Sequence, residues 1–102
     1  MSGAEIAALV GKGLQVSSID AEGGKHFSSR SNISPDGRIS GTLNIPGQQA
    51  IPFSGAWKLK GAQFCRMLNP IQPEEVCETW VKTGAREFIV QVGGKDASVA
   101  RW

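Results

Sequence analysis

The two cysteines of this chain are the residues whose chemistry is most distinctive. Cys65 and Cys77 lie twelve positions apart within "GAWKLKGAQFCRMLNPIQPEEVCETWVKTG" (55–84). A disulfide, two buried free thiols, and a metal or redox site compete as interpretations. A zinc site needs four ligands, and the cysteines and the single histidine supply three. A redox pair normally has Cys-x-x-Cys spacing. We favour a disulfide, which stabilises a small domain by roughly 3 kcal/mol and implies the periplasm or the outside of the cell.

The single histidine, His26, stands beside serines in "GKHFSSRS". A hydrolase would use His26 as a base next to Ser28 or Ser29, with a carboxylate to orient the ring. No G-x-S-x-G motif supports that chemistry. We therefore interpret His26 as a solvated strand residue, expect no catalytic residues and no enzyme, and keep a small hydrolase as the alternative function.

Other candidate motifs are weak. The glycine pairs in "GKG" and "GGK" do not match a phosphate-binding loop. Glu74, Glu75 and Glu78 form an acidic patch beside Cys77, which we interpret as a solvent-exposed loop and strand edge. The formal net charge is +2 without a basic run, which argues against nucleic acid as a partner. We expect no metal and no cofactor.

The elements that position these residues are mostly strands. The only helical pattern is 3–12, where Ile6, Leu9 and Val10 repeat at helical spacing and Ser2 with Glu5 forms a capping box. Alternating apolar residues and turn signals predict strands over the rest of the chain. These strands are expected at 14–20, 25–33, 38–45, 50–59, 64–68, 76–83, 87–92 and 97–102, with a polar proline loop at 69–75.

This pattern predicts an all-β fold in a single domain, residues 1–102. The short connections indicate an antiparallel meander of seven or eight strands, forming a small barrel or a curled sheet, with one short N-terminal helix. No βαβ unit is present. The residues predicted to form the core are Ile6, Leu9, Leu43, Ile51, Phe53, Trp57, Leu59, Phe88, Val90 and Val92.

The interior of such a barrel is either filled by side chains or wide enough for one small ligand. Three tryptophans and four phenylalanines favour a filled interior. A cavity of roughly 300 Å³ or more would instead favour a small ligand. The candidate ligand-binding residues are Phe53, Trp57, Arg66 and Trp80, of which Trp80 could face either inward or outward.

The order of features resembles a known family. The chain runs from "AEIAALVGK" through "SPDGRISG", "GAW", "FCRML" and "CETWV" to a final hairpin that ends in tryptophan. It is similar to small uncharacterised bacterial secreted domains, common in alphaproteobacteria, with a helix, a D-G turn, a G-x-W strand and two cysteines about a dozen residues apart. The resemblance implies secretion and a calycin-like barrel, and it supplies no catalytic residues. The absence of tyrosine and the proline loop at 69–75 depart from that pattern.

These observations predict a non-catalytic binding module of the bacterial cell envelope. Its partner would be another protein or a small apolar ligand. The beginning, "MSGAEIAALVGKG", has no basic region followed by a long apolar region, so it is not a signal peptide as it stands. No stretch is long and apolar enough to span a membrane as a helix. We expect a periplasmic or secreted monomer.

Overall fold

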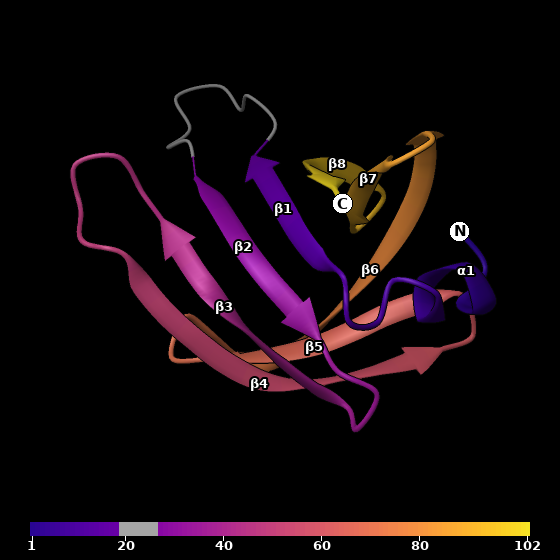
Figure 1. Cartoon of the computed structure of the whole chain (residues 1–102), viewed down its shortest axis with the longest axis horizontal. Helices are drawn as coiled ribbons and strands as arrows, with labels where there is room; N and C mark the ends of the chain where they lie inside the picture. The colour runs from indigo at the N-terminus through magenta and orange to yellow at the C-terminus, as the bar shows by residue number, and fades with distance from the viewer. Residues whose placement is uncertain (19–26) are drawn as a thin grey trace.

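The strand-rich sequence folds into a closed antiparallel β-barrel (Figure 1). The computed structural model describes residues 1–18 and 27–102. Within these residues, eight strands pair in chain order, and β1 also pairs with β8 to close the barrel. The strands are β1 (Gly13–Ser18), β2 (Ser28–Ile33), β3 (Arg38–Asn44), β4 (Ile51–Lys60), β5 (Gln63–Asn69), β6 (Gln72–Gly84), β7 (Glu87–Val92) and β8 (Lys95–Arg101). The predicted all-β meander is therefore confirmed.

The predicted proline loop at 69–75 is wrong, because β6 already begins at Gln72. Only residues 70–71 connect it to β5. The β5–β6 register shifts between Arg66 and Leu68, since Arg66 pairs with Val76 while Leu68 pairs with Gln72. Pro73 lies in this bulge, where its missing amide proton removes no regular ladder bond.

The N-terminal helix is shorter than the predicted 3–12. Helix α1 spans Gly3–Ala7, and the expected capping box joins Ser2 to Glu5 in both directions. Beyond it the chain tightens into turns, in which the Leu9 amide donates to the Ile6 carbonyl at 3.0 Å. Gly11 then has φ = 84°, a left-handed conformation that glycine adopts readily and that ends the helical path.

The α1 end of the barrel is filled. Ile6 and Leu9 are buried in the core, and Figure 1 shows α1 beside this end of the barrel. Aromatic rings from β4 to the C-terminal residue continue the filling, with neighbouring ring centroids between 4.3 and 5.7 Å apart. In order, these rings are Trp57, Phe64, Trp80, Phe88 and Trp102.

Most of the predicted core packs together, with two exceptions. Val92 is 37% exposed, because it follows a register shift between Val90 and Gln91 and lies at the end of β7. Ile51, the first residue of β4, is partly buried but, unlike Leu43, Trp57 and Leu59, does not pack against the buried cluster. The buried hydrophobic residues that the prediction did not include are Leu14, Ile33, Ile39, Phe64, Cys65, Leu68, Trp80 and Ala100.

Gly41 permits a close contact inside the barrel. A Cβ atom at this position would lie 2.0 Å from the Arg30 carbonyl oxygen and 2.7 Å from Cζ of Phe53. The ring of Phe53 therefore lies directly against the β3 backbone. This contact explains why a glycine interrupts the apolar alternation of β3.

Candidate functional site

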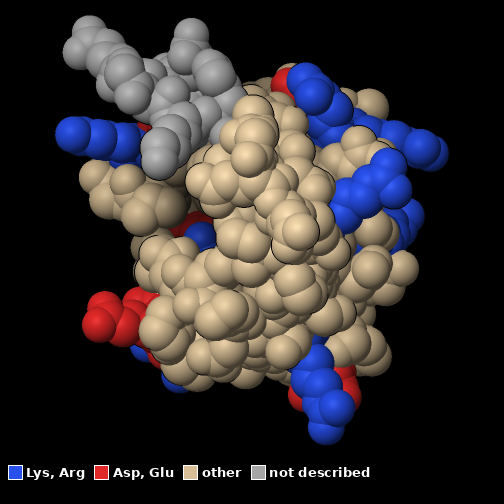
Figure 2. Space-filling model, turned by 90° about the vertical axis from the view of Figure 1, so that its left-hand side faces the viewer, with Lys and Arg blue, Asp and Glu red and all other residues tan. Residues whose placement is uncertain are grey.

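The barrel contains a cavity of about 380 Å³. Inward-facing apolar side chains supply most of its wall, among them Leu14, Val16, Ile39, Leu43, Phe53 and Val90. Phe27, Ile45 and Ile71 line it from connections between strands at the end away from α1. Figure 2 views the molecule from that side and shows a hollow in a largely uncharged surface. The expectation of a filled interior thus holds for the α1 end but not for this half of the barrel.

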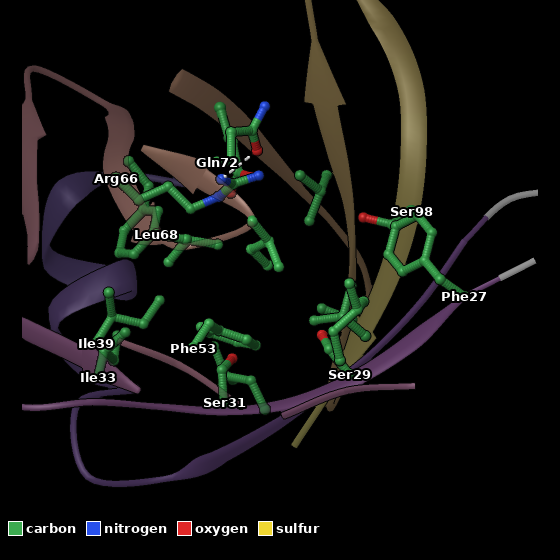
Figure 3. Close-up of a pocket in the computed structure, with 18 of the residues that line it drawn as sticks. Phe27, Ser29, Ser31, Ile33, Ile39, Phe53, Arg66, Leu68, Gln72 and Ser98 are labelled. Atoms are coloured by element: carbon green, nitrogen blue, oxygen red, sulfur yellow. Dashed lines mark hydrogen bonds and ion pairs between the residues drawn. The ribbon is translucent and has the colours of Figure 1, made fainter. Parts of the chain in front are cut away.

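A hydrogen-bonded ion pair forms one part of the cavity wall (Figure 3). Arg66 Nε donates to Glu78 Oε2 at 2.8 Å, and its Nη1 donates to Gln72 Oε1 at 2.7 Å. Trp80 Nε1 donates to the other carboxylate oxygen, Glu78 Oε1, at 3.0 Å. The side chains of Arg66 and Glu78 are only 17% and 8% exposed. The interpretation of Glu78 as part of a solvated acidic patch is therefore wrong.

The pairing of β5 with β6 places this network inside the barrel. Cys65 pairs with Cys77 and Phe64 pairs with Glu78. Because side chains alternate across a strand, Arg66 shares the inner face of β5 with Phe64, and Glu78 shares the inner face of β6 with Trp80. Arg66 and Glu78 are diagonal neighbours, within reach of a long side chain.

The predicted disulfide is confirmed. Cys65 and Cys77 are bonded, with Cα atoms 4.0 Å apart. Sγ atoms of both cysteines lie near a carboxylate oxygen of Glu75, but sulfurs bonded to each other are not thiolate ligands for a metal. A hydrogen bond from Lys60 lowers the pKa of the Glu75 carboxyl below its ordinary value, and Lys58 lowers it further.

Serine side chains lie on other parts of the cavity wall. Ser29 and Ser31 come from β2, and Ser98 comes from β8. Figure 3 shows Arg66 on one side of the cavity and Ser29 and Ser98 on the other. Ser31 and Ser98 are almost fully buried. Together these residues supply hydroxyl groups to a wall that is otherwise mainly apolar.

Three of the four predicted ligand-binding residues, Phe53, Arg66 and Trp80, line the cavity. Trp57 does not: its ring stacks on Phe64 at the α1 end, and its Nε1 donates to the Ser34 carbonyl at 2.9 Å.

Sequence reasoning did not identify Glu78, Gln72 or the serines as part of the cavity wall. The sequence does contain a pattern that could have placed Glu78 on the inner face of its strand. It stands two positions before Trp80, and therefore shares its face of the strand.

The alternative function, a small hydrolase, would use His26 with Ser28 or Ser29. His26 lies outside the described residues, so its distance to a serine is not defined. Ser28 is exposed, whereas Ser29 lines the cavity. Ser29 is therefore described as part of the cavity wall, without a catalytic role.

The chain matches no known protein-family model, and no curated protein is significantly similar to it. The eight-stranded barrel, the disulfide and the short N-terminal helix are compatible with a calycin-like fold. Among the described residues, no helix has the length and apolar character required to cross a membrane.

Proposed function

We propose that this protein is a non-catalytic binding module that holds a small, mainly apolar ligand inside its barrel. The observation that supports this proposal is the cavity of about 380 Å³, which falls within the size range of small-molecule sites, roughly 300–1,000 Å³. Its mixture of an apolar wall with a few polar groups is also typical of such sites. The cavity favours a small ligand over a protein as the partner.

The cell envelope or the extracellular space is the proposed location. A disulfide persists in oxidising compartments and is rare in the cytosol. The bond between Cys65 and Cys77 supports a periplasmic or secreted protein, as does the resemblance to secreted bacterial domains. Each described strand is paired on both sides. The barrel therefore offers no open strand edge to another chain, which favours a monomer.

Binding of an uncharged fluorescent probe tests the proposal. N-phenyl-1-naphthylamine brightens in apolar surroundings, so titration into the protein should give a saturable rise in fluorescence. Replacing Ser31 with Phe fills part of the cavity and should weaken probe binding by about tenfold or more, which corresponds to about 1.4 kcal/mol. Asn32→Phe is the matched control, because Asn32 is exposed on the next position of the same strand.

The control variant should bind the probe within about threefold of the parent, since its new ring lies outside the barrel. Circular dichroism and thermal melting would establish that both variants are folded. Absence of saturable binding to the parent would contradict the proposal. Equal probe affinity in folded Ser31→Phe and parent protein would contradict it as well.

A further inference from the structure

We propose that the cavity prefers ligands whose polar group is uncharged and accepts hydrogen bonds, such as a primary amide, a ketone or an alcohol. A carboxylate is disfavoured at the same place. This inference rests on the proposed function, since it concerns which small molecules the barrel holds. It follows from the charge and the hydrogen bonds of the group around Arg66.

The charges of the cavity wall are already balanced. Among the lining residues in the described part of the chain, Arg66 and Glu78 are the charged ones. They form a one-to-one pair at 2.8 Å, and both side chains are largely shielded from outside solvent. The cavity therefore presents a neutral pair, and Arg66 is not an uncompensated cation that would require an anionic ligand.

In the part of the chain that the structure describes, the polar groups of this site that still lack a hydrogen-bond partner are donors, the N–H groups of Arg66. Both oxygens of Glu78 already accept, one from Arg66 and one from Trp80. On the guanidinium, Nε and Nη1 donate to Glu78 and Gln72, while Nη2 has no partner among the described residues. An arginine carries five N–H donors and no acceptor. A polar ligand group beside Arg66 is therefore best satisfied as an acceptor.

A carboxylate in this position would compete with Glu78 for the same guanidinium. The two anions would lie on neighbouring sides of one cation, in a place with little water to screen them. Like charges brought together at a binding site oppose association strongly. A neutral acceptor takes the same N–H group without this repulsion, and its apolar part packs against the aliphatic and aromatic wall.

The volume limits the size of the test ligands. At about 30 Å³ for each non-hydrogen atom, which is the volume of one water in the liquid, the cavity fully encloses roughly a dozen such atoms. The larger probe would extend from the cavity into the hollow that Figure 2 shows at the surface. Decanamide and decanoate meet this limit and have the same number of non-hydrogen atoms. They differ in the head group, a neutral amide in one and, at pH 8, an ionised carboxylate in the other.

The experiment measures displacement of N-phenyl-1-naphthylamine by each ligand from the folded, disulfide-bonded protein. We expect decanamide to bind the parent on the order of tenfold more tightly than decanoate, or better. A purely apolar cavity would also disfavour a charge, so two variants separate the causes. Glu78→Gln removes the balancing charge and should lower the ratio of decanoate Kd to decanamide Kd by about tenfold. Gln72→Glu adds a carboxylate beside the same guanidinium and should raise this ratio.

The outcomes distinguish the inference from the proposed function. Decanoate binding as tightly as decanamide, or a ratio that neither variant changes, would overturn the preference while leaving a ligand-binding barrel. Opposite shifts of the ratio in the two variants support the preference. Gln72 is exposed, so its variant gives an answer even where Glu78→Gln does not fold. Failure of the parent to bind the probe and both ligands would overturn the preference together with the proposed function.

Discussion

Breaking the buried pair of Arg66 and Glu78 by removing one partner should destabilise the barrel strongly, and a double-mutant cycle can measure the coupling between the two residues. Replacing Arg66 with Met keeps a long apolar stem but removes the charge. Glu78, only 8% exposed, then retains the N–H of Trp80 but loses its cationic partner. Removing one partner of a buried pair typically costs about 3–5 kcal/mol, and we expect Arg66→Met to fall in this range.

The partner variant should be less severe. Glu78→Gln preserves the shape of the side chain, and its amide oxygen can still accept from Trp80. Arg66 keeps its bond to Gln72 and is 17% exposed, so the unpaired cation is less isolated. We expect a cost of about 1–2 kcal/mol, close to that of losing a charged hydrogen bond. The double variant has no buried charge and should cost about 1–3 kcal/mol, clearly less than the two single changes together.

Urea denaturation followed by tryptophan fluorescence would give the unfolding free energy of the four proteins. The coupling energy between the two positions should be about 2 kcal/mol or more. Additivity of the two single changes within about 0.5 kcal/mol would refute the argument, because independent sites behave in this way. The pair would then not act as a desolvated unit.

Three further predictions concern the framework of the barrel. Replacing Cys65 and Cys77 together with Ala should lower the unfolding free energy by about 2–3 kcal/mol, measured by urea denaturation, and a loss below 0.5 kcal/mol would contradict a bracing role. Gly41→Ala should cost about 2 kcal/mol or more, because its Cβ overlaps a β2 carbonyl, and an unchanged melting temperature would disprove that close approach. The lowered pKa of Glu75, caused first by Lys60, stabilises the fold above the ordinary value of 4.5, and this contribution disappears as the pH falls through the lower folded pKa. The parent should therefore melt above Glu75→Gln at pH 7, and this difference should shrink as the pH is lowered below 4.5; a difference that stays constant would rule out this linkage.

The sequence by itself determined the strand meander and favoured the disulfide, which the structure confirms. Apolar residues alternating at a period of two, separated by turns such as "SPDG", leave few alternatives to short antiparallel neighbours. The pairing of Cys65 with Cys77 follows from the same reasoning, since adjacent strands joined by a short connection bring such residues face to face. These features depend on local chemistry and on near neighbours in the chain.

Local sequence patterns were less reliable where the register of neighbouring strands decides whether a residue lies in a strand and whether its side chain is buried. The polarity of 69–75 predicted a loop, but a bulge allows Pro73 to lie within β6. Val92 continues an apolar alternation in sequence, yet it follows a register shift at the end of β7 and is exposed. A bulge inserts residues into one strand, and no residue type reliably marks its position in the amino-acid sequence.

Only the tertiary structure decided that the barrel has a filled half and a hollow half. The count of aromatic residues says how much ring volume exists but not where it lies. Closure of β1 on β8, together with α1 at one end, determines which inward positions meet. The five rings from Trp57 to Trp102 gather at that end, whereas Phe27 and Phe53 line the cavity. The burial of Glu78 has the same origin. A glutamate is hydrophilic in every local window, and its place inside the barrel depends on a guanidinium from the neighbouring strand that offsets the cost of removing its charge from water.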